Sequence, residues 1–111
     1  MTSDDDAVSG ELVDETARIS LDELGALCGV RTESLVEMVE AGVIRAEGER
    51  PGIWRFSTVA VVRSRKALRL RRDLDINLPG LAVTLDLLDR VEALEGELKA
   101  LRQRLAKLQE D

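Results

Sequence analysis

The chain has 111 residues, of which 44% are hydrophobic and 34% charged, and its formal net charge is −6. This length allows one small domain with an extension, and the abundance of Leu, Ala, Glu and Arg beside only two aromatic residues favours helices over a β-sandwich. Histidine is absent and Cys28 is the only cysteine, which excludes histidine-based catalysis, Cys/His zinc sites and an intramolecular disulfide. We therefore expect no catalytic residues, no cofactor and no metal.

Residues 1–17 form an acidic arm ahead of the first predicted element. Residues 1–18 hold six acidic side chains against Arg18 alone, so most of the net charge lies there. We expect this arm to be disordered, because it offers few apolar side chains for burial. No apolar stretch reaches the roughly 20 residues of a membrane span, and the acidic beginning is unlike a signal sequence. These features predict a soluble, cytoplasmic protein with no membrane partner.

Residues 18–76 are expected to form a small helical domain. Ser20 and Glu23 have the spacing of a capping box, and Gly29 ends the short helix that follows. Thr32 is expected to cap a second helix, which Gly42 ends. Two short helices joined by residues 29–31 predict a helix-turn-helix unit.

Two β-prone runs, residues 43–46 and 53–56, flank a Gly/Pro turn and predict a hairpin. A hairpin in this place is the wing of a winged helix, with Trp54 and Phe56 as its anchors in the core. Ser57 is expected to cap a third helix that runs to about Asp75. Residues 63–72 of that helix hold six bases and no acid. They are either a phosphate-facing patch or a face whose bases meet acids elsewhere in the protein.

Residues 77–111 predict one long helix that begins at Pro79. Leucines and a valine repeat every seven residues in two series offset by three, which is the a/d pattern of a coiled coil. One helix cannot bury that stripe alone, so we expect a homodimer; packing against the small domain is the alternative. The charges flanking the stripe do not decide the direction of the pair. The expected dimer interface is Leu87, Val91, Leu94, Leu98, Leu101, Leu105 and Leu108.

A second apolar stripe lies at the beginning of the same helix, beside acidic residues. Leu81, Leu85 and Leu88 are spaced four and three apart, which places them on one helical face. The stripe either docks the helix onto its own small domain or offers an apolar centre to a partner. A second acidic surface is predicted on the helix of residues 32–41, which carries Glu33, Glu37 and Glu40.

The predicted order of elements resembles the MerR family of regulators over about residues 18–108. The fold class is thus mainly α: a MerR-like winged helix-turn-helix with a small β-hairpin wing and a long C-terminal coiled-coil helix. DNA-binding members typically carry Arg-Tyr-Tyr where this chain has Val36, Glu37 and Met38, whereas Leu35 and Gly42 are kept. Carboxylates repel phosphates, so we do not expect nucleic acid as a partner. A MerR- or HspR-like transcriptional regulator remains the alternative, and a plain coiled-coil assembly subunit is a third.

Residues 78–89, preceded by 69–74 and followed by 101–105, resemble the CbpM branch of this superfamily, the chaperone modulators. The resemblance implies a protein that binds the J-domain of CbpA, a DnaJ-type co-chaperone, and prevents it from stimulating the Hsp70 chaperone DnaK. J-domains present a basic helix, so an inhibitor should offer carboxylates around an apolar centre. The expected J-domain contacts are Leu81, Leu85, Asp86, Leu88, Asp89 and Glu92.

Overall fold

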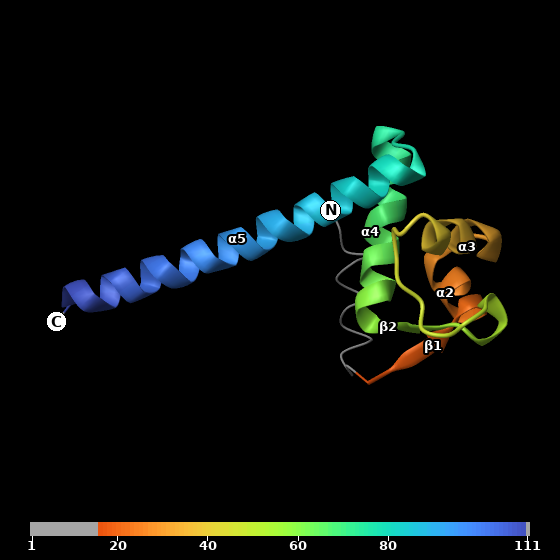
Figure 1. Cartoon of the computed structure of the whole chain (residues 1–111), viewed down its shortest axis with the longest axis horizontal. Coiled ribbons are helices and arrows are strands. Elements are labelled where there is room, and N and C mark those ends of the chain that lie inside the picture. The colour runs from red at the N-terminus through yellow and green to blue at the C-terminus, as the bar shows by residue number, and fades with distance from the viewer. Residues whose placement is uncertain (1–15, 111) are drawn as a thin grey trace.

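The structure is a computed structural model, and it describes residues 16–110 (Figure 1). Figure 1 shows the short elements gathered around α4, while α5 runs away from this small domain to the C-terminus. The acidic arm lies outside the described residues, apart from its last two. The elements are β1 (Arg18–Ser20), α2 (Leu21–Cys28), α3 (Thr32–Glu40), the 3-10 turn η1 (Pro51–Ile53), β2 (Arg55–Ser57), α4 (Thr58–Leu74) and α5 (Leu78–Glu110).

Local caps define the ends of the helices in the small domain. The Glu23 amide donates to Ser20 Oγ at 3.1 Å, and the Ser20 amide donates to Glu23 Oε1 at 2.8 Å, which confirms the capping box. Gly29 ends α2 with a φ of 69°, a left-handed conformation that glycine adopts at little cost. Ser57 caps α4, accepting from the Ala60 amide at 3.2 Å.

Two helix starts differ from the prediction by one residue. Arg31 takes the cap position of α3 without a side-chain bond, and Thr32 is the first helical residue. Asn77 caps α5, because its Oδ1 accepts from the Gly80 amide at 2.8 Å. The helix therefore begins at Leu78, and Pro79 lies within its first turn.

The antiparallel two-stranded unit is present, but the two runs predicted to pair with each other do not form it. β2 pairs with β1, in a register that sets Ile19 opposite Phe56. Residues 43–46 are not a strand: Val43 and Ile44 are both buried, whereas neighbouring residues of a half-buried strand point to opposite faces. Residues 47–55 form a loop, called the wing loop below. It is closed by one bridge, in which Glu47 and Arg55 exchange two backbone hydrogen bonds of 2.9 Å.

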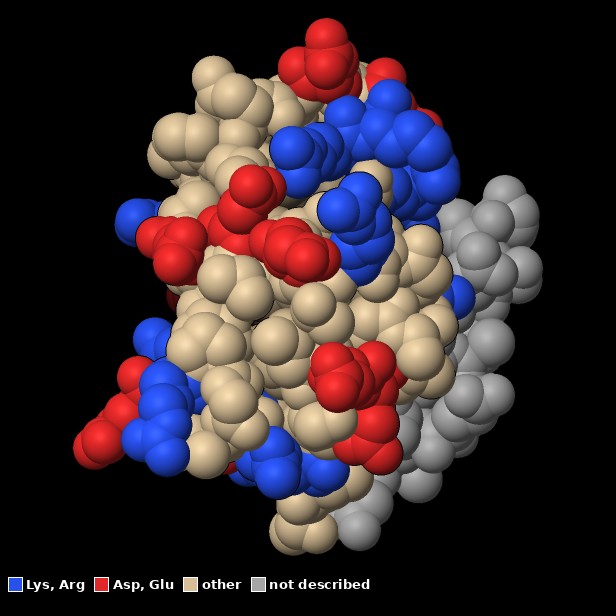
Figure 2. Space-filling view, turned by 90° about the vertical axis from the view of Figure 1, so that its right-hand side faces the viewer, with Lys and Arg blue, Asp and Glu red and all other residues tan. Residues whose placement is uncertain are grey.

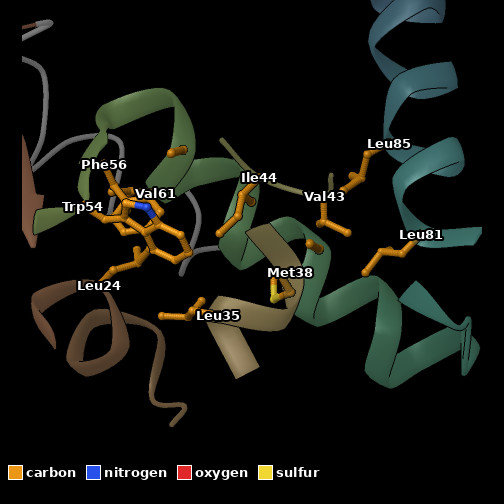
Figure 3. Close-up of a cluster of buried hydrophobic side chains, with 12 residues drawn as sticks. Leu24, Leu35, Met38, Val43, Ile44, Trp54, Phe56, Val61, Leu81 and Leu85 are labelled. Carbon is orange, nitrogen blue, oxygen red and sulfur yellow. The ribbon is translucent and has the colours of Figure 1, made fainter. Parts of the chain in front are cut away.

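The hydrophobic core joins the small domain to the first turns of α5 (Figure 3). Trp54 and Phe56 are buried in it with their rings edge to face at a centroid distance of 6.2 Å, which confirms them as anchors of the wing. Leu81 and Leu85 are fully buried, and Figure 3 shows them pointing from α5 toward Val43. The mainly helical fold class with its long C-terminal helix is confirmed.

The capping box is expected to make stability depend on pH. The hydrogen bonds from Ser20 hold the pKa of Glu23 below its ordinary value. The carboxylate therefore stabilises the fold above the ordinary carboxyl pKa of about 4.3, and this contribution is lost as the pH falls through the lower, folded pKa. We expect Glu23→Gln to lower the urea midpoint at pH 7 and to leave it unchanged near pH 2. An equal loss at both pH values would contradict this.

Candidate partner-binding site

Arg63 clamps α5 onto the small domain. It lies in the second turn of α4, and its Nε donates to the Val43 carbonyl at 2.7 Å. Its other two nitrogens reach across to α5, where Nη1 donates to Asp89 at 2.6 Å and Nη2 to Asp86 at 3.0 Å. One guanidinium thus joins three segments of the chain, and the planar fork suits such paired carboxylates.

The carboxylates held by this clamp remain largely open to solvent. The side chains of Asp86 and Asp89 are 71% and 54% exposed, whereas that of Arg63 is only 19% exposed. One turn further along, Glu92 Oε2 lies 3.6 Å from Lys66 Nζ. The three predicted acidic contacts therefore lie together where α5 leaves the small domain. A partner approaching here would meet mainly carboxylate oxygens, already fixed in direction.

The leucine stripe beside these acids does not lie on the surface. Leu81 and Leu85 are fully buried in the protein's own core, and Leu88 is partly buried against it. This is the docking alternative that the sequence left open. Since the small domain covers them, Leu81 and Leu85 cannot supply an apolar centre to a partner in this arrangement. Of the three leucines, only Leu88 remains partly accessible.

At least four of the six bases in the basic run of α4 bond to other groups of the protein. Arg63 and Lys66 pair with acids of α5, and Arg72 pairs with its neighbour Asp73. Arg65 donates to the Leu27 carbonyl at 2.6 Å. For these side chains the structure supports bases that meet partners elsewhere in the chain rather than a patch that faces phosphates.

The second acidic surface is formed by α3. Glu33, Glu37 and Glu40 are exposed, and Arg31 Nε lies 3.9 Å from Glu33 Oε1. Figure 2 looks onto this side of the small domain and shows acidic side chains across its middle, with basic side chains both above them and along the lower edge. A helix in the position of a recognition helix thus presents carboxylates.

The a/d stripe of α5 is exposed along its whole length. Its exposed fractions run from 47% at Leu98 to 70% at Leu108. A continuous apolar stripe of this kind is uncommon on a monomer in water. The residues are those predicted for the dimer interface: Leu87, Val91, Leu94, Leu98, Leu101, Leu105 and Leu108.

Reactive groups and metal ligands do not gather in the part of the chain that the structure describes. Burial raises the pKa of the Cys28 thiol, although the charge of Arg65 opposes the shift. The thiol therefore stays protonated at neutral pH, the state in which cysteine is a poor nucleophile. Residues 16–110 contain no cluster of three or more side chains able to hold a metal ion, and their helices are too short or too polar to cross a membrane.

The sequence alone does not reveal the role of Arg63 or of the Val43 carbonyl. When six bases lie in one run, the sequence does not indicate which acidic residue each of them pairs with. The available signal was spacing: Ala60, Ser64 and Ala67 are buried, and Arg63 lies beside them on the inward side of α4.

Comparisons with known proteins agree with this architecture. Residues 19–103 match the family described as MerR HTH family regulatory protein, so the molecule is a helix-turn-helix protein of the MerR type. A chaperone modulatory protein CbpM from Coxiella burnetii is 38% identical over 96 residues, which cover 86% of this chain and 91% of that protein. The CbpM of Citrobacter koseri is 35% identical over a stretch that covers 86% of this chain and 95% of that protein. The CbpM of Pseudomonas putida is 35% identical over a stretch that covers 70% of this chain and 77% of that protein. The chain belongs to the CbpM family of chaperone modulatory proteins.

Proposed function

We propose that this protein binds the J-domain of a CbpA-type, DnaJ-like co-chaperone and inhibits its stimulation of the Hsp70 chaperone DnaK. It carries out no chemistry of its own and acts in the cytoplasm as a homodimer. The observation that carries the proposal is the group of exposed carboxylates on α5, Asp86, Asp89 and Glu92, in a member of the CbpM family.

Electrostatic complementarity supports this partner. The basic helix of a J-domain needs an acidic surface to bind, and complementary charge sets both the rate and the specificity of such an encounter. Asp86 and Asp89 are already oriented by Arg63, so less side-chain freedom is lost when a partner binds them. Leu88, partly buried at the edge of this group, adds apolar contact.

Dimerisation is supported by the exposed stripe of α5. Leu94, Leu98 and Leu101 stand on a helix that extends beyond the small domain, and nothing within residues 16–110 of the same chain covers them. Pairing with a second copy buries all seven positions at once. In this proposal residues 77–111 are the dimerisation segment and residues 18–76 the winged domain.

The DNA-binding alternative is the weaker one. It needs a recognition helix that attracts phosphates, whereas α3 exposes Glu33, Glu37 and Glu40. Three of the bases of α4 that could offset this charge, Arg63, Lys66 and Arg72, are paired with acids of the same chain.

Removing the two clamped charges is expected to abolish most of the inhibition. Asn at positions 86 and 89 still accepts hydrogen bonds from Arg63, so Asp86→Asn with Asp89→Asn removes charge but keeps the geometry. We expect the concentration needed to suppress J-domain-stimulated ATPase activity of DnaK to rise by about tenfold or more. Circular dichroism should be unchanged.

The matched control removes two charges from α3, through Glu37→Gln with Glu40→Gln. It should inhibit like the unaltered protein. If this control loses inhibition while the α5 variant keeps it, the contact lies on α3 and the assignment to α5 is wrong.

A further inference from the structure

A cleft of about 620 Å³ opens between the wing loop, the first turn of α4 and the first half of α5. Its apolar lining includes Val39, Val43 and Val59. Val43 is fully buried, but Val59 is 73% exposed, the most exposed of the large apolar residues described. A single exposed valine is ordinary. This one, however, lies in the same cleft as three carboxylates.

Those carboxylates come from two different elements. Glu47 belongs to the wing loop and is 54% exposed, while Asp86 and Asp89 belong to α5. The cations that face them are Arg18, which pairs with Glu47 at 2.9 Å, the largely covered Arg63, and Arg45. Arg45 is exposed in the lining. The lining itself carries three carboxylates against two arginines, a net charge of −1, and Asp86 and Asp89 are far more exposed than the Arg63 that pairs with them.

We infer that this cleft receives a lysine or arginine side chain from the basic helix of the J-domain. Such a side chain has an aliphatic stem and a charged head, and it is stabilised where the two meet different surroundings. The stem would lie on Val59 and the partly buried Val39, and the head between Glu47 and the two aspartates. An acidic or purely apolar occupant would match only one half of this lining.

This inference rests on the proposed function and extends it to two further elements. The exposed acids of α5 alone make a flat contact, whereas the cleft makes the wing loop and the first turn of α4 part of the binding site. The fold would then place the wing loop against a helix of the partner protein.

The test measures binding of a fluorescently labelled J-domain of the CbpA type by anisotropy, using the full chain. Val59→Arg puts a bulky cation in the cleft and should weaken binding by about tenfold. Leu74→Arg is the matched control, since Leu74 is also exposed on α4 but lies at the opposite end, outside the cleft. It should bind within about twofold of the unaltered protein.

A gain of affinity keeps the test independent of folding. Arg45→Glu replaces an exposed cation of the lining by a carboxylate and should tighten binding by about threefold, which a misfolded variant could not do. Unaltered binding by both Val59→Arg and Arg45→Glu, with the unaltered protein binding normally, would overturn the cleft while leaving the proposed function in place. Absence of binding by the unaltered protein would overturn both.

Discussion

Replacing Leu94 and Leu101 by glutamate is expected to convert a dimer into a monomer. Both side chains are more than half exposed in the single chain, and both lie at d positions of the stripe. In a helix pair of either direction each would bury a carboxylate in the apolar seam, at a cost of several kcal/mol for each unpaired charge. Light scattering should report the chain mass of 12.2 kDa for the variant and twice that mass for the unaltered protein.

The matched control adds the same two charges on another face of the same helix. Ala93 and Ala100 are exposed c positions, so Ala93→Glu with Ala100→Glu should remain dimeric. A monomeric mass for the unaltered protein, or an unchanged dimer after the leucine replacements, would remove the coiled-coil assignment.

Replacing Arg63 by methionine is expected to lower the stability of the protein more than replacing Arg72, another basic residue of α4. Methionine keeps the unbranched stem but removes three hydrogen bonds, to the Val43 carbonyl, Asp86 and Asp89. The Val43 carbonyl then loses its partner, and the two neighbouring aspartates repel each other without their shared cation. We expect the free energy of unfolding to fall by about 2 kcal/mol.

Arg72→Met is the control for this prediction. Arg72 is 73% exposed and pairs only with the adjacent Asp73, so its loss should cost no more than about 0.5 kcal/mol. Urea denaturation of both variants at pH 7 measures the difference. Equal stability of the two would show that the clamp does not hold α5 to the small domain.

The parts of this fold that follow from sequence are those set by local chemistry. Ser20 with Glu23, Gly29 and Ser57 act within one turn of the chain, so their spacing alone predicts the caps. The heptad repeat likewise predicts a long helix with one continuous stripe. The residues Asp86, Asp89 and Glu92 also lie together, as helical spacing requires.

The parts that escape prediction depend on contacts between distant segments. β2 pairs with β1, although the helix-turn-helix separates the two strands in sequence. A strand of three residues has too short a pattern to predict which strand it pairs with. Leu81 and Leu85 form a clear stripe, yet periodicity states only that a helix face is apolar and not which surface covers it. Arg63 is indistinguishable from its basic neighbours until α5 is seen to cross α4.

The most direct test of the account is calorimetric titration of the full chain against the isolated J-domain of the CbpA-type co-chaperone from the same organism. The J-domain of DnaJ serves as the comparison. We expect saturable binding near one J-domain per protomer, and weak or absent binding to the J-domain of DnaJ. Absence of saturable binding to either J-domain would contradict the proposed function and return the DNA-binding alternative to first place, despite the carboxylates of α3.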